Sequence, residues 1–146
     1  MQASFDPVKV VVVLGGVPIL GFTRGTAVEI AYTSPLWTEK TDLSGKLVRS
    51  KTNDLSAIVT LTLDQSSPSN AYLSRLAQRD LLAGSGSGVF SITDLNGATF
   101  YTSAQAYVKA YPNSAWGAES DARAWQIVCS RLVGFESGLP LDDLAI

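Results

Sequence analysis

Residues 56–64 read SAIVTLTLD, and their apolar side chains recur at every second position. Such alternation is typical of a β-strand with one face in a core and the other toward water. Only Ile58 interrupts the polar side. The apolar set is Ala57, Val59, Leu61 and Leu63, and the polar set is Ser56, Thr60, Thr62 and Asp64.

Segments before this strand also predict β-structure. Residues 46–51 are expected to pair with it as an antiparallel hairpin across Thr52-Asn53-Asp54, because Asn and Asp favour turns. Residues 28–32 alternate in the same way and predict another strand.

A hairpin is predicted near the start of the chain. Residues 8–14 are almost entirely β-branched, and residues 17–22 form the returning strand. Gly15-Gly16 between them can adopt the positive φ angles that a tight turn requires.

One helix is predicted, over residues 68–82. A hydroxyl residue precedes Pro68, and apolar residues then follow at helical spacing. The glycine-rich run at residues 84–88 should end the helix. That run lacks the Gly-Lys-Ser/Thr ending of a phosphate-binding loop and stands after a helix, so we expect no phosphate site there.

More strands are predicted after the helix, at residues 89–93, 98–103 after an Asn96-Gly97 turn, 104–111 and 124–132. We therefore expect a mainly β, α+β fold, an antiparallel β-sandwich or barrel with one flanking α-helix. The length predicts a single domain, residues 1–146. Residues 33–45 and a C-terminal arm at residues 136–146 are the candidate mobile parts.

The connection at residues 33–45 shows neither strand nor helix periodicity. It nevertheless holds Leu36 and Trp37, which a disordered linker would gain nothing by exposing. Two interpretations of Trp37 stay open: it packs back on its own sheet, or it contacts a neighbouring subunit.

Charge and hydropathy exclude several kinds of function. The net charge is −2, and the eleven Lys and Arg residues are scattered from Lys9 to Arg131 without forming a patch for phosphates. Tight nucleic-acid binding is therefore not expected. The apolar run at residues 8–14 is too short to span a bilayer and follows no basic segment, so we expect neither a membrane segment nor a signal peptide.

Catalytic chemistry is also not expected. The chain has no histidine, the commonest metal ligand and proton shuttle, and a single cysteine, so we expect no metal, no cofactor, no internal disulfide and an intracellular site of folding. Cys129 shares a predicted strand face with Trp125 and Ile127, which favours a core position over an activated thiolate.

The acidic residues likewise suggest no catalytic pair. They fall in turns or in the tail, at Asp54, Glu119, Asp121 and Asp142-Asp143. Arg123 is expected to form a structural ion pair with Glu119.

A series of motifs runs in order along most of the chain. The motifs are Phe5-Asp6-Pro7 with Val10, Val12, Gly16, Ile19, Gly21 and Phe22; Asn53-Asp54-x-Ser56 before residues 59–63; Gln65-Ser66-Ser67-x-Ser69-Asn70-x-x-Leu73-Ser74-x-Leu76; Asp94-Leu95-x-Gly97; Ala104-x-Ala106-Tyr107; and Glu119-x-x-x-Arg123-x-Trp125. Together they resemble the tail tube proteins of contractile-tailed phages, the inner tube of myoviruses. Residues beyond Phe135 match nothing in that pattern.

This resemblance implies a β-barrel-like subunit related in architecture to Hcp of type VI secretion. Its subunits would close into hexameric rings that stack into a tube and conduct the genome into the host, with no enzymatic step. The implied partners are further copies of the chain, the tail sheath, the baseplate and the tape-measure protein. The implied location is the virion, with assembly in the host bacterial cytoplasm and no membrane contact.

Two sets of residues are candidates for these roles. Glu29, Thr60, Thr62 and Asp64 would face the lumen, where a mildly acidic wall lets DNA pass without sticking. The ring-stacking candidates, all in the connection at residues 33–45, are Leu36, Trp37, Thr38, Glu39 and Lys40. The predicted helix, residues 68–82, belongs to neither set. Its outer face is expected either to be solvated or to contact the sheath.

Three alternatives remain. A tube subunit of a tailocin or of a type VI secretion system fits the same pattern. A monomeric β-sandwich could use its Tyr and Trp residues to hold a carbohydrate or a peptide. A small hydrolase built on Asp or Ser is the third.

Overall fold

The computed structural model describes residues 10–95 and 97–137. Ten strands and one helix form, and the predicted fold class, a mainly β chain with one helix, is confirmed for these residues. The elements are β1 (Val10–Leu14), β2 (Val17–Pro18), β3 (Val28–Tyr32), β4 (Trp37–Thr41), β5 (Leu47–Lys51), β6 (Ala57–Asp64), α1 (Ser69–Ala83), β7 (Gly88–Asp94), β8 (Phe100–Ala110), β9 (Ala122–Cys129) and β10 (Val133–Phe135).

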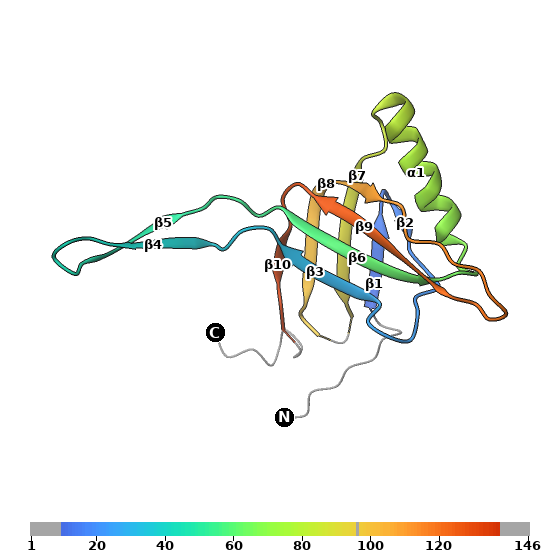
Figure 1. Ribbon diagram of the computed structural model, residues 1–146, viewed down its shortest axis with the longest axis horizontal. Helices are drawn as coiled ribbons and strands as arrows, with labels where there is room; N and C mark the ends of the chain where they lie inside the picture. Colours follow the sequence, from blue (N-terminus) through green and yellow to red (C-terminus); the bar gives the residue numbers. More distant parts are fainter. Residues whose placement is uncertain (1–9, 96, 138–146) are drawn as a thin grey trace.

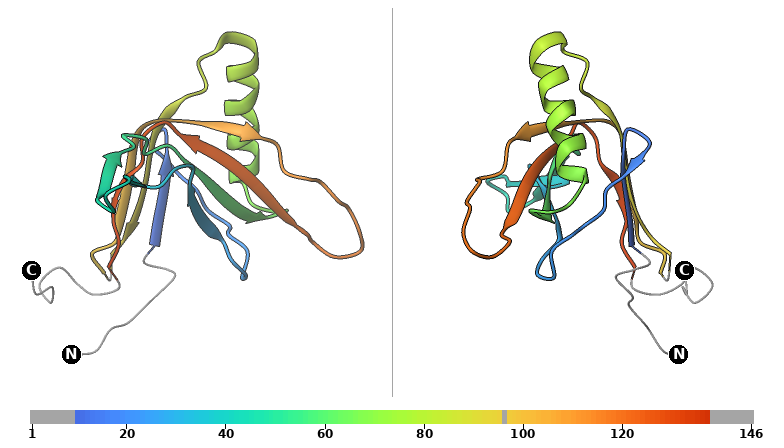
Figure 2. Two further views of the ribbon diagram at one scale, coloured as in Figure 1. Left: turned by 60° about the vertical axis from the view of Figure 1, so that its left-hand side comes forward. Right: turned by 90° about the vertical axis from the view of Figure 1, so that its right-hand side faces the viewer.

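Eight strands form one antiparallel sheet in the order β2-β1-β7-β8-β9-β6-β3, with β10 beside β8. The register shifts between Gly88 and Phe90 and again between Val108 and Ala110, and such irregularities increase the bend of a sheet. The sheet folds over on itself, so that β3, β6 and β9 cross β1, β7 and β8 (Figure 1). Figure 2 shows the same two layers separating toward the lower edge of both views.

The core lies between these two layers. The burial pattern of β6 alternates strictly, as SAIVTLTLD predicts, and all four of its apolar inward residues are fully buried. They face Leu14 of β1 and Phe90 of β7, both also fully buried. Trp125, Ile127 and Cys129 share the buried face of β9, which confirms that predicted face.

Helix α1 lies on the other side of the molecule from the β4–β5 hairpin (Figure 1). It buries Leu73, Leu76 and Ala77 and ends at Gly84, whose left-handed conformation and N–H bond to the Asp80 carbonyl confirm the predicted stop. The predicted start was off by one position, because Pro68 is the N-cap residue and not the first helical residue.

The predicted hairpin between residues 46–51 and residues 56–64 is wrong. β5 pairs with β4 in a separate two-stranded sheet, whereas β6 pairs with β3 and β9. The connection at residues 33–45, expected to be irregular, therefore contains strand β4. The physical reason is burial: β6 needs neighbours with an apolar face, and every residue of β5 is exposed.

Three smaller expectations also change. The runs at residues 98–103 and 104–111 form one strand, β8, that bends and bonds β10 at its start and β9 at its end. The return strand at residues 17–22 is reduced to β2 and an isolated bridge between Phe22 and Leu63. Strand β10 was not predicted, because three residues carry no periodic signal.

Candidate functional site

The outward side of β3, β6 and β9, which we call the polar face, holds all four residues predicted to face a lumen. Glu29 lies opposite Thr60 in the register, and Thr60 in turn lies opposite Gln126. Residues opposite one another on neighbouring strands share a face of the sheet. The members are Glu29 and Ala31 of β3; Ile58, Thr60, Thr62 and Asp64 of β6; and Ala122, Ala124, Gln126 and Val128 of β9.

The polar face carries no lysine or arginine, and its charges are the carboxylates of Glu29 and Asp64. Asp64 accepts a hydrogen bond from the Ser120 hydroxyl (2.6 Å), and this bond holds the pKa of Asp64 below its ordinary value. The carboxylate therefore stays ionised at neutral pH. Such a surface offers phosphate groups hydroxyls and negative charge but no counter-charge.

The second candidate surface is the arm, residues 37–51, which comprises β4, β5 and their turn. It projects from the folded sheet (Figure 1), and all ten of its strand residues are exposed. The turn is organised by the Asp42 carboxylate, which accepts from the backbone N–H and hydroxyl of Ser44 and from the Lys46 N–H. Leu43 at the tip is fully exposed.

The ring-stacking candidates lie on both sides of the arm. Trp37 and Glu39 share one side with Leu47 and Arg49, and these four residues line a shallow hollow of about 330 Å³. The Arg49 guanidinium carbon lies 4.1 Å from the centroid of the Trp37 ring. Trp37 therefore lies in strand β4 of the arm, and it also lines a second hollow with Leu55 and Arg131 at the root of the arm.

The other side of the arm carries the remaining candidates. Thr38 and Lys40 lie opposite Ser50 and Val48 there, and Leu36 directly precedes β4. Leu36 is 63% exposed, and its carbonyl accepts from the Thr52 N–H (3.0 Å) at the base of the arm.

The root of the arm is held by Asp54. One carboxylate oxygen accepts from the Ser56 N–H (3.0 Å) and hydroxyl (2.7 Å), and the other accepts from the hydroxyls of Ser34 (2.7 Å) and Thr33 (3.3 Å). The Ser56 hydroxyl is the largest cause that lowers the pKa of Asp54 to about 2. Sequence reasoning placed Asp54 in a turn but missed that it joins the segment before the arm to the segment after it.

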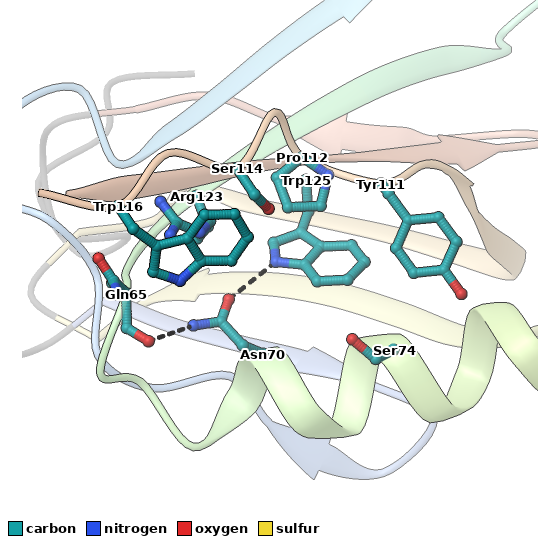
Figure 3. A pocket seen from close by; sticks show the side chains of 9 residues that line it. All are labelled: Gln65, Asn70, Ser74, Tyr111, Pro112, Ser114, Trp116, Arg123 and Trp125. Atoms are coloured by element: carbon teal, nitrogen blue, oxygen red, sulfur yellow. Dashed lines mark hydrogen bonds between the residues drawn. The ribbon is translucent and has the colours of Figure 1, made fainter.

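A hollow of about 350 Å³ beside the N-terminal half of α1 is where an aromatic binding module would hold a ligand (Figure 3). Trp125 Nε1 donates to Asn70 Oδ1 (2.9 Å), while Asn70 Nδ2 donates to the Asp64 (2.9 Å) and Gln65 (3.3 Å) carbonyl oxygens. The remaining lining residues are Ser74, Tyr111, Pro112, Ser114, Trp116 and Arg123.

The charged group of this hollow is also bonded within the protein. Arg123 is 6% exposed and donates to the carbonyl oxygens of Ala115 (2.8 Å) and Ala122 (3.1 Å), so the predicted pairing with Glu119 is wrong. Its guanidinium carbon lies 5.5 Å from the centroid of the Trp116 ring. The arrangement therefore joins α1, β9 and residues 111–121, with its amide and guanidinium groups directed at protein partners.

Cys129 is fully buried, as predicted for a core residue, and burial raises the pKa of its thiol to about 11. In the described part of the chain, no three acidic or cysteine side chains gather as a metal site would require. None of the described helices is long and apolar enough to cross a membrane.

Comparison with solved structures finds the same fold in contractile injection systems. The anti-feeding prophage cap, the AFP tube terminating cap, superposes with a TM-score of 0.67 at 15% identity and covers 94% of both chains. The sheath/tube terminator of the PVC extracellular contractile injection system gives 0.66 at 14% identity, covering 92% of this chain and 99% of the terminator.

A chain of the PVC sheath-tube complex in its extended state gives 0.64 at 15% identity, covering 92% of this chain and 93% of the other. No family model and no curated protein matches the sequence. The chain therefore shares its fold, over nearly its whole length, with these chains of contractile injection systems.

Proposed function

We propose that this chain is a non-enzymatic structural subunit of a contractile tail or injection system, in which copies close into rings at the tube. The likeness of fold to a tube terminating cap, a sheath/tube terminator and a chain of a sheath-tube complex supports the proposal. Two surfaces of this chain support it independently, the arm and the polar face.

The arm is the observation that carries the proposal. A two-stranded hairpin is marginally stable alone in water, and this one exposes Leu43, Leu47 and Val48. Hydrogen bonds to Asp54 hold the root of this hairpin, and the hairpin projects away from the sheet. In a free monomer its apolar side chains would therefore gain no contact with the core. Packing against another copy would cover these apolar side chains, which makes the arm a ring-to-ring or subunit-to-subunit contact.

The polar face suits the lumen of such a ring. DNA binds proteins chiefly through Lys and Arg contacts that release counterions from phosphates, and the polar face supplies none. Glu29, Thr60, Thr62 and Asp64 would let a genome or another cargo slide past without being held.

Our specific proposal is that the chain forms the inner tube of a phage tail, a stack of hexameric rings inside a sheath. The baseplate would nucleate this tube, and a tape-measure protein would set its length. The particle would be the virion, assembled in the bacterial cytoplasm. A tube subunit of a tailocin or type VI secretion system would use the same surfaces. A tube terminator is the second candidate, because two of the similar structures are a cap and a terminator.

Negative-stain electron microscopy of the purified chain over a concentration series tests this proposal. Rings or hollow tubes are expected. A matched variant replaces residues 37–51 with Asn-Gly, a two-residue turn that can keep the Thr52 N–H near the Leu36 carbonyl. It should form rings that do not stack, whereas the control Trp116→Ser, an exposed site outside the arm, should assemble like the parent chain.

Long tubes from the armless variant would refute the role of the arm. Parent rings that stay single but bind the ends of preformed tubes would favour the terminator. Monomers at every concentration would instead favour the monomeric binding module.

A further inference from the structure

An apolar groove, which we call the wedge groove, opens where β3 diverges from β8 and β10. One end is closed, because the Tyr32 hydroxyl donates to the Leu132 carbonyl oxygen (2.8 Å). The whole hollow has a volume of about 390 Å³ and lies between residues of β3 and residues of β7, β8 and the segment after β10. The lining residues are Val28, Ile30, Tyr32, Ile92, Thr99, Tyr101 and Glu136.

One wall of the wedge groove is an unpaired sheet edge. Among the described residues β3 pairs with β6 alone, and the bonds from Thr62 N–H to the Ala27 carbonyl and from Thr33 N–H to the Ser56 carbonyl show which residues point toward β6. By alternation, the backbone groups of Val28, Ile30 and Tyr32 point the other way. The edge is therefore a template for one more strand.

The described chain ends at the rim of this groove. Tyr101 donates its hydroxyl to Glu136 Oε2 (2.8 Å), and the Ser137 N–H donates to Thr99 Oγ1 (2.8 Å). The Thr99 hydroxyl in turn donates to the Ser137 carbonyl oxygen. Since Thr99, Tyr101 and Glu136 all line the wedge groove, Ser137, the last described residue, lies at its rim.

Those residues, 138–146, read GLPLDDLAI. Nine extended residues reach roughly 30 Å, whereas a five-residue strand such as β3 needs only about 17 Å. Leu139 and Leu141 stand two positions apart, so they would point to the same side of a strand. Pro140 between them, which has no N–H, would turn its backbone away from β3, as proline does in edge strands.

We propose that residues 138–146 bind the wedge groove of their own chain, pairing with the free edge of β3 and placing Leu139 and Leu141 among Val28, Ile30 and Tyr101. The acidic pair that follows, Asp142-Asp143, would then lie toward water, away from the Glu136 carboxylate. This occupant covers the apolar wall and the unpaired edge together, which protects the subunit from edge-to-edge aggregation. The inference is independent of the proposed function.

Hydrogen–deuterium exchange on the full chain and on a chain ending at Ser137 tests the proposal. Removing residues 138–146 should speed exchange of the Val28, Ile30 and Tyr32 amides by roughly tenfold or more, while exchange in β6 stays unchanged and reports an intact fold. Leu139→Asp with Leu141→Asp should reproduce the effect. Asp142→Asn with Asp143→Asn, the matched control, should not. Equal exchange of the β3 amides in the full and shortened chains would overturn the proposal.

A disulfide trap identifies the occupant. In a Cys129→Ala background, Ile30→Cys combined with Leu141→Cys should form an intramolecular disulfide, seen as an oxidised monomer by mass spectrometry. Disulfide-linked dimers in place of that monomer would assign the groove to a second copy and overturn the proposal, as would protection of β3 that rises with protein concentration.

Discussion

Replacement of Asn70 by alanine should destabilise the protein, because this side chain joins α1 to β9. Its amide oxygen accepts the indole N–H of Trp125, which is only 2% exposed. Its amide nitrogen donates to the carbonyl oxygens of Asp64 and Gln65, on the segment that leads into the helix. Alanine removes all three bonds.

The cost follows from these contacts. A buried donor left without a partner costs about 1–3 kcal/mol, and the bond to the Asp64 carbonyl is worth about 0.5–1.5 kcal/mol. The longer bond to Gln65 adds little. We therefore expect a loss of about 2–4 kcal/mol in the free energy of unfolding. For a chain of this size each 1 kcal/mol lowers Tm by about 2–4 °C, which gives a fall of roughly 4–16 °C.

Urea and thermal unfolding followed by near-ultraviolet circular dichroism measure this loss, and a double-mutant cycle assigns it. Trp125→Phe removes the indole N–H but keeps an aromatic ring beside Tyr111, whose ring centroid lies 5.6 Å away. Asn70→Ala should then cost about 1 kcal/mol less than in the parent chain. Equal costs in the two backgrounds, within about 0.5 kcal/mol, would refute the reasoning. Ser74→Ala, in the same hollow, is the control.

Three further outcomes are expected. The pKa of Asp54 lies near 2, below its ordinary 3.8, so its hold on the arm root is present above pH 4 and is lost as the pH falls toward 2; NMR titration of its carboxyl carbon should show a midpoint near 2, and a midpoint near 4 would contradict this. Cys129, buried and with a pKa of about 11, should resist thiol reagents at pH 8 until the protein unfolds, and prompt stoichiometric labelling would argue against a core position. Gly134→Ala should lower stability by about 1–3 kcal/mol in urea unfolding, because its β-carbon would overlap the Tyr101 ring, whereas Gly117→Ala meets no atom within 4 Å and should be nearly neutral; similar values for both would be inconsistent with this packing.

The sequence predicts those elements whose periodicity is imposed by the core. Residues 56–64 alternate because β6 buries one face in the core and leaves the other open, so side-chain chemistry and burial repeat together. The Gly15-Gly16 turn was predictable for a similar reason, since both residues adopt the positive φ angles, 62° and 81°, that glycine tolerates best.

The pairing of strands was not predictable from periodicity. The alternation indicates which face of β6 is buried, but it does not indicate which strand pairs with β6. The prediction that residues 46–51, the nearest preceding segment, pair with β6 was therefore wrong. β6 instead pairs with β9, more than fifty residues further along. Strand β4 gave no signal because an element that buries nothing has no burial period to display.

The two candidate surfaces differ in the same respect. The β3 and β6 residues Glu29, Thr60, Thr62 and Asp64 of the polar face were predictable, because they alternate with inward-facing residues of the same strands. The β9 members were not, because they depend on the pairing of β6 with β9. The arm was recognised only through Leu36 and Trp37, apolar residues in a segment without periodicity. Leu43 at its tip, the Arg49–Trp37 contact and the Asp54 root were all missed, since none follows from local spacing.

The polar face and the arm are both exposed to solvent, but they differ in how much they would gain by being covered. This difference favours a subunit that assembles with other copies. The polar face combines hydroxyl, amide and carboxylate groups with alanine, isoleucine and valine side chains on a sheet whose other side is packed in the core, so it gains less by being covered than the arm does. The arm places large apolar side chains on a ribbon that is not supported by a core, and it gains most by being covered. A monomeric binding module needs only one concave surface with unsatisfied polar groups, and the hollow beside α1 directs its amide and guanidinium groups inward. A ring subunit needs both kinds of surface at once, one to adhere and one to let cargo pass.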